Sequence, residues 1–133
     1  MMGAWDTELF DNDSALDWLG DYEEANADQR TQLVTQALEV PDENNYFDSD
    51  EGCNAIAAVA VLAAHKNPAL LPEGHNAAFL RALPEPTPQQ SLAALVALDR
   101  VLAADSELLD LWGESGLQDT FVAQIIALKS YFH

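Results

Sequence analysis

The sequence is poor in basic residues. Five Lys and Arg stand against 23 Asp and Glu, which gives a net charge of −18 at pH 7. A surface of this sign repels nucleic acid phosphates and anionic lipid headgroups, so we expect neither a nucleic acid partner nor a membrane partner. The same charge attracts a basic protein surface, at a rate that falls as salt is added.

Cysteine and long apolar runs are also scarce. Cys53 is the single cysteine, which excludes an intramolecular disulfide and fits a reducing compartment. Its apolar neighbours predict a small buried side chain and not a nucleophile. The longest strictly apolar run, residues 55–64, has ten residues, half of the ~20 that a bilayer requires. Residues 1–8 lack the basic and apolar regions of a secretory signal, so we expect a cytoplasmic protein.

Helical periodicity dominates the chain from residue 13 onward. With 133 residues, of which 49% are hydrophobic, the chain suits one domain with one core. We therefore predict an all-α protein with a single domain, residues 1–133. It is a compact bundle of six to seven helices around a central apolar, alanine-rich helix at residues 51–66. The other predicted helices span residues 14–25, 28–40, 76–83 and 88–104, a segment after residue 105, and residues 117–132.

Helix starts and buried faces have local signals. Thr87 and Gln90 form a capping box with Pro88 at the first helical position, and Asp50 is the expected N-cap of the central helix. Helical spacing assigns further residues to the core. They are Ala15, Trp18, Leu19 and Tyr22 in the first helix; Leu33, Val34, Ala37 and Leu38 in the second; Leu92, Leu95, Val96, Val101 and Leu102 in 88–104; and Phe121, Val122, Ile125, Ile126 and Leu128 in 117–132.

Residues 2–19 carry the most distinctive motif. Its notable positions are Gly3, Ala4, Trp5, Phe10, Asn12, Asp13, Ala15, Asp17 and Trp18. This pattern resembles the opening of the bacterial family catalogued as domain of unknown function 4259, and residues 48–58 and 100–112 resemble that family too. The family usually has glycine in place of Asp6 and Glu8. If those glycines bring backbone N–H groups to an anion, this chain has lost that ability. The resemblance implies a fold and a family, but no activity.

The motif is interpreted first as structure. Trp5 and Phe10 are expected to dock the N-terminal segment onto the helices. Asn12 or Asp13 is expected to cap the first helix, and Trp18 belongs to its apolar stripe. We therefore expect these residues to pack against the helices, and a binding role is the second interpretation of the motif.

The charge is polarised along the chain. Residues 1–51 contain fifteen acids and a single base, Arg30, for a net charge of −14, whereas residues 52–133 carry −4. The functional hypothesis is a protein-interaction module, such as an inhibitor or immunity-type protein, that binds a basic partner. Its acidic edge is formed by Asp6, Glu8, Asp11, Asp13 and Asp17.

Two alternatives stay open at this point. One is a divalent-metal-binding protein or hydrolase that uses surface carboxylates; the other is an accessory helical protein whose acidity serves solvation. Counted from Asp48, the positions where a calcium loop needs Gly and Glu hold Cys53 and Val59 instead. His65, His75 and His133 share no metal-ligand spacing. We therefore predict no catalytic residue, no metal site and no cofactor, and a monomer or weak homo-oligomer.

Overall fold

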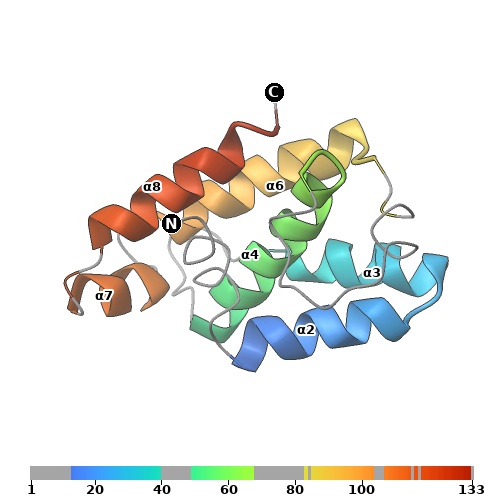
Figure 1. The fold of residues 1–133 in the computed structure, drawn as a ribbon, viewed down its shortest axis with the longest axis horizontal. Coiled ribbons are helices and arrows are strands. Elements are labelled where there is room, and N and C mark those ends of the chain that lie inside the picture. The colour runs from blue at the N-terminus through green and yellow to red at the C-terminus, as the bar shows by residue number, and fades with distance from the viewer. Residues whose placement is uncertain are drawn as a thin grey trace.

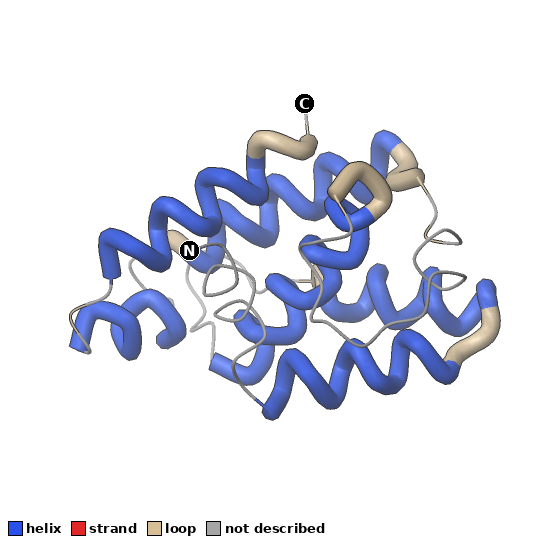
Figure 2. The backbone as a smooth tube through the Cα atoms, viewed as in Figure 1, coloured by secondary structure: helices blue, strands red, loops and turns tan. Residues whose placement is uncertain are grey.

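The computed structural model describes residues 13–39, 49–67, 83, 85–103, 107–114, 116 and 118–132. The regular structure of these residues is helical, in agreement with the predicted all-α class (Figure 2). The helices are α2 (Asp13–Glu24), α3 (Ala27–Ala37), α4 (Ser49–Ala64), α6 (Pro88–Val101), α7 (Glu107–Glu114) and α8 (Gln118–Lys129). The predicted helix at 76–83 lies outside the described residues except for its last position, so the expected count of six to seven helices for the whole chain stays a prediction.

Helix α4 occupies the centre of the bundle. It contacts α2, α3, α6, α7 and α8, with α2 and α3 below it in the view of Figure 1 and α6 and α8 above it. Every side chain of residues 55–64 is at most 3% exposed. Small alanine side chains on all sides of α4 allow neighbouring helices to approach closely, and the predicted central helix is therefore confirmed. Cys53 is buried near its start, as its apolar neighbours predicted.

Local capping chemistry determines where two of the helices begin. Thr87 caps α6 with Pro88 in the first turn, and its Oγ1 accepts a hydrogen bond from the backbone N–H of Gln90 at 3.1 Å. A second capping box, which the sequence reading had missed, joins Asn26 and Gln29 at the start of α3: Asn26 Oδ1 accepts from Gln29 N at 2.9 Å. The cap expected from Asp50 is wrong, because α4 already begins at Ser49. Residues 48–50 are all of N-cap type, so composition alone cannot choose among them.

Two predicted buried faces are corrected. Leu92 and Val96 were expected in the core, but they are 65% and 48% exposed, because α6 instead turns a stripe of Ala94, Ala97, Leu98 and Val101 inward. That stripe has the same helical spacing, and its alanines fit against the alanine-rich α4, which α6 contacts. Ile126 of α8 was likewise expected inside and is 56% exposed.

Helix α2 contributes two aromatic side chains to the described core. Trp18 and Tyr22 are buried and stack with ring centroids 5.5 Å apart. This confirms the predicted apolar stripe of the first helix, to which Trp18 belongs. Trp5, Phe10 and Asn12, the other residues of the structural motif, lie outside the described residues. None of the helices that the structure describes is long and apolar enough to cross a membrane.

Candidate functional site

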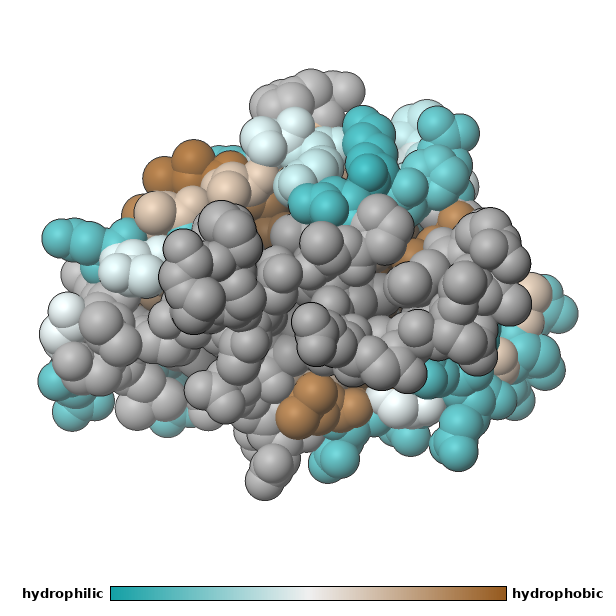
Figure 3. Space-filling model, in the orientation of Figure 1, coloured by the Kyte–Doolittle hydropathy of each residue, from teal (hydrophilic) through white to brown (hydrophobic). Residues whose placement is uncertain are grey.

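Helices α2 and α3 form an antiparallel pair joined by a short turn at residues 25–26, and the pair packs on α4. Most of the described α2 residues that do not face the core are acidic, the exceptions being Leu16 and Gly20. Asp17, Asp21, Glu23 and Glu24 are all exposed. In the face shown in Figure 3, the described residues at the lower right, where α2 meets α3, are mainly hydrophilic. This end of the bundle therefore offers acidic side chains to solvent.

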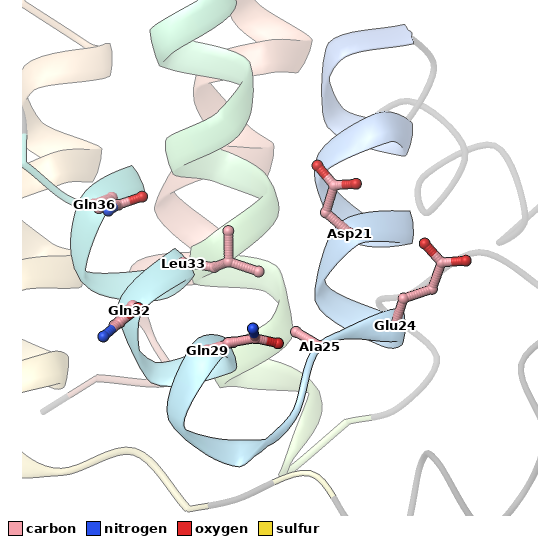
Figure 4. Close-up of a pocket in the computed structure, with 7 residues that line it drawn as sticks. All are labelled: Asp21, Glu24, Ala25, Gln29, Gln32, Leu33 and Gln36. Carbon is pink, nitrogen blue, oxygen red and sulfur yellow. The ribbon is translucent and has the colours of Figure 1, made fainter.

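A groove of about 390 Å³ runs between the two helices. It is lined by Asp21, Glu24, Ala25, Gln29, Gln32, Leu33 and Gln36. Leu33 of α3 and Asp21 of α2 lie on the sides of the two helices that face each other, whereas the Glu24 side chain extends from the end of α2 with its carboxylate directed away from the gap (Figure 4). The groove is thus half-buried and apolar at its floor, with acidic groups on the α2 side and amides on the α3 side.

The composition of this groove suits a cationic side chain. A lysine or arginine carries a long aliphatic stem and a charged head, so its stem can cover Leu33 while its head meets Asp21 or Glu24. Glutamine side chains supply carbonyl oxygens as further acceptors. None of the described residues that line the groove is basic, so nothing on these walls opposes an incoming cation.

The opposite face of α3 carries the single base of residues 1–51. Arg30 Nε donates to the carbonyl oxygen of Tyr22 at 2.8 Å, and Nη2 donates to that of Glu23 at 2.8 Å. Its guanidinium carbon lies 5.0 Å from the centre of the Tyr22 ring. The last carbonyls of a helix lack intrahelical donors and form the negative end of its dipole. Arg30 therefore closes the C-terminal end of α2 and fixes the angle between α2 and α3.

A second cavity, of about 230 Å³, lies beside this arginine. It is lined by Tyr22, Ala27, Arg30, Thr31, Val34, Leu62 and Gln90. Burial raises the pKa of the Tyr22 phenol above its ordinary value of 10.0, and the positive charge of Arg30 partly opposes that rise. The two cavities thus lie on opposite faces of one helix and have different charge.

The family model described as "Domain of unknown function (DUF4259)" matches residues 3–124, which is most of the chain. The chain belongs to the DUF4259 family. The resemblance seen in residues 2–19 is thereby confirmed. No curated protein and no solved structure matches the chain. Membership of DUF4259 brings no activity with it, so the chemistry of this member has to be argued from its own residues.

The acidic edge predicted for this DUF4259 member is described only in part. Asp17 is exposed on α2, and Asp13 is the first residue of that helix. Asp6, Glu8 and Asp11 lie outside the described residues. Asp21 is one helical turn beyond Asp17, so the described acidic surface continues from the predicted edge into the groove.

Sequence reasoning missed the residues of the groove that come from α3. The sequence does contain a pattern that points to them, because Gln29, Gln32 and Gln36 recur at helical spacing on the predicted helix 28–40. Among the described residues of this DUF4259 chain, no group of three or more His, Cys, Asp or Glu side chains could hold a metal ion. The surface carboxylates Asp17 and Asp21 of α2 therefore belong to no such group among the described residues.

Proposed function

We propose that this DUF4259 member is an acidic protein-interaction module that binds a basic partner, as an inhibitor or immunity-type protein does. The observation that carries the proposal is the α2–α3 groove, whose lining includes the acids Asp21 and Glu24 and the apolar side chain of Leu33. A basic side chain of the partner enters this groove. The surrounding negative charge accelerates the encounter by about 10–10³-fold at low salt.

The proposed contact extends along α2 toward the N-terminus. Asp17 lies one turn before Asp21 on the exposed side of α2. In the proposal, Asp6, Glu8, Asp11 and Asp13 continue the same acidic surface and act mainly by steering. Rim charges of this kind change association rates more than dissociation rates, whereas a side chain buried in the groove slows dissociation. The free protein is a cytoplasmic single domain, either a monomer or a weak homo-oligomer.

The test compares two charge reversals of equal size. The variant Asp21→Lys with Glu24→Lys removes the acidic wall of the groove, and the matched variant Glu85→Lys with Glu114→Lys makes the same change in net charge at two exposed positions outside the groove. Each tagged protein is used to capture partners from its own cell lysate at low salt, followed by a salt step and mass spectrometry. Thermal unfolding followed by circular dichroism checks that each variant is folded.

The expected result is one stoichiometric basic protein that leaves with salt, is captured by the matched control and is lost with the groove variant. Equal loss with both variants would mean that only total charge matters, and the groove would then have no role. Capture of no specific protein by the unchanged chain would contradict the interaction module and favour the accessory protein whose acidity serves solvation. Stopped-flow binding of the Asp11→Lys, Asp13→Lys and Asp17→Lys triple variant then tests steering, since an unchanged association rate contradicts that part of the proposal.

A further inference from the structure

The cavity beside Arg30 is formed by side chains from four helices. Tyr22 comes from the end of α2, Leu62 from α4 and Gln90 from the first turn of α6, while the remaining lining residues lie on α3. Its volume is about 230 Å³. A dry protein cavity of about 150 Å³ holds a benzene molecule, so this one has room for a substituted ring. Concave sites with an apolar floor and a few polar groups are where proteins bind small molecules.

The side chains that line this cavity range from exposed to fully buried. Ala27 and Thr31 are exposed and mark its mouth, whereas Arg30 and Gln90 are half-buried. The floor is made of three buried side chains, Tyr22, Val34 and Leu62. A ligand therefore places an apolar body against the floor and keeps its polar group near the mouth.

Arg30 contributes shape to this cavity, and its charge is already used within the protein. Its guanidinium donates to the carbonyl oxygens of Tyr22 and Glu23 and lies over the Tyr22 ring, and Arg30 has a further interaction besides these. The protein as a whole carries −18, which disfavours an incoming anion. A cationic ligand would be placed next to the guanidinium, which repels it. The surroundings therefore favour an uncharged ligand.

Two polar groups near the mouth are oriented by hydrogen bonds within the protein. Gln90 Oε1 accepts from Thr87 N at 2.9 Å, which leaves the N–H donors of its NH₂ group for a ligand. Thr31 Oγ1 donates its proton to the Ala27 carbonyl at 3.2 Å, so its oxygen can serve a ligand as an acceptor. A hydroxyl group matches both, since it accepts from the amide and donates to the threonine oxygen. Because both groups are already held in place, binding costs little ordering.

We propose that this cavity binds a small uncharged ring compound that carries one hydroxyl group, such as a phenol or a cyclic alcohol. The ring covers Val34 and Leu62, and the hydroxyl bonds to Gln90 and Thr31. A plain hydrocarbon covers the same floor but makes neither hydrogen bond. A carboxylate brings a negative charge to a protein that already carries −18, and it has no proton to give to Thr31.

The test uses phenol as the probe, with toluene and benzoate as comparison ligands built on the same ring. Near pH 7 phenol is uncharged and benzoate is ionised. Binding is followed by the amide resonances of the ¹⁵N-labelled full chain. The variant Thr31→Trp fills the cavity from its mouth, and Thr35→Trp is the matched control one turn along α3. Both threonines are exposed and both donate to the carbonyl four residues earlier, but only Thr31 is among the lining residues.

A second pair of variants tests the contact to the hydroxyl group. Thr31→Val keeps the shape of the side chain and removes its oxygen, so it should weaken phenol binding by about three- to tenfold and leave toluene binding unchanged. Thr35→Val is the matched control and should change neither.

Phenol is expected to shift the resonances of residues 30, 31 and 34, and to bind at least about fivefold more tightly than toluene or benzoate. Thr31→Trp loses this binding and Thr35→Trp keeps it. Toluene binding as tight as phenol, or phenol binding that Thr31→Val does not weaken, overturns the hydroxyl assignment, and benzoate binding as tight as phenol overturns the uncharged ligand. Equal binding by the two tryptophan variants, or no binding of phenol at about 10 mM, overturns the site. These measurements do not involve the basic partner proposed above, so either idea can fail without the other.

Discussion

Helix α3 lies between the groove and the cavity, and each of its two faces contributes a row of residues with helical spacing to one of them. Residues 29, 32, 33 and 36 border the groove toward α2, and residues 27, 30, 31 and 34 border the cavity toward α4 and α6. Each set follows the i, i+3, i+4, i+7 pattern of one helix face. The groove side carries acids from α2 and amides from α3, whereas the cavity side carries one arginine and buried aliphatic groups.

This difference teaches how an acidic protein can keep a cation in a fixed place. Exposed carboxylates on α2 tolerate one another because water and salt screen them. Arg30 is instead partly buried, hydrogen-bonded to the end of α2 and placed over the Tyr22 ring. The cavity side of α3 is therefore held by contacts within the protein, whereas the groove side is exposed and is the side proposed above to meet a partner.

The largest expected difference between the two sides of α3 is in the cost of replacing a leucine with alanine, at Leu62 in the cavity and at Leu33 in the groove. Leu62→Ala removes a side chain that is 3% exposed, so it should lower the free energy of unfolding by about 2–5 kcal/mol. Leu33 in the groove is only half-buried, and Leu33→Ala should cost about 1 kcal/mol, because less apolar surface returns to water. Urea unfolding of both variants measures the difference. Equal costs would show that the groove floor is as much part of the core as the cavity floor.

The sequence predicted best what local chemistry controls. The Thr87 and Gln90 capping box depends on four consecutive residues and was confirmed, and the stripe of Trp18 and Tyr22 combines large apolar side chains with clear helical spacing. Asn26 and Gln29 form the same kind of box, so the start of α3 at Ala27 could also have been predicted from the sequence, although the predicted helix began one residue later, at residue 28. Short-range signals thus carried most of the information on helix position.

The orientation of α6 could not be obtained in this way. Leu92 and Val96 define one apolar stripe, and Leu98 and Val101 define another when alanines are counted as core residues. Which stripe turns inward depends on the alanine-rich partner surface of α4, which lies about 35 residues away in sequence. The two cavities depend on tertiary packing in the same manner, since the walls around Arg30 come from four helices.

Removal of the arginine should have the next largest effect. Arg30→Met keeps most of the aliphatic stem but removes the two hydrogen bonds that the guanidinium donates to the carbonyl oxygens of Tyr22 and Glu23, which should cost about 1.5–3 kcal/mol. Gln32→Met, on the groove side of the same helix, should change stability by less than about 0.5 kcal/mol. Arg30→Lys should fall between them, because an ammonium group cannot reproduce the planar pair of bonds. Chemical unfolding gives all three values; an Arg30→Met cost as small as that of Gln32→Met would contradict the role given to Arg30.

The pH dependence of the protein's stability should show a smaller effect, which also arises on the cavity side of α3. Burial raises the pKa of Tyr22 above 10.0 in the folded state, so the unfolded chain loses this proton first as the pH rises. The contribution of Tyr22 to stability is therefore complete below about pH 10 and is lost as the pH passes from 10 through the folded pKa. Tyr22→Phe should remove this component of the alkaline loss. In Arg30→Met the phenol should titrate at still higher pH, whereas Glu24→Gln in the groove should leave its titration unchanged. Absorbance titration of the phenols at high pH checks the order.

The smallest expected effect is a gain in stability, unlike the losses above, and it concerns an acid on the groove side of α3. Asp21 has Asp17 four residues before it and Glu24 three residues after it, all exposed on α2. Asp21→Asn removes repulsion between these like charges, so it should raise the free energy of unfolding by about 0.2–0.5 kcal/mol at low salt. The gain should vanish near 1 M salt, where the screening length falls to about 3 Å.

Asp119→Asn is the control for the sign of this change. Asp119 is also exposed, but it lies in the first turn of α8, where a negative charge favours the helix dipole, and no acid lies three or four residues from it. Its neutralisation should lower stability at low salt, again by a few tenths of a kcal/mol. If both variants are stabilised alike, the net charge of −18 of the whole protein governs the response. The acids of the groove would then repel one another no more than the other acids of the protein do. Opposite signs would instead show that the α2 surface holds repulsion that a basic partner can relieve on binding.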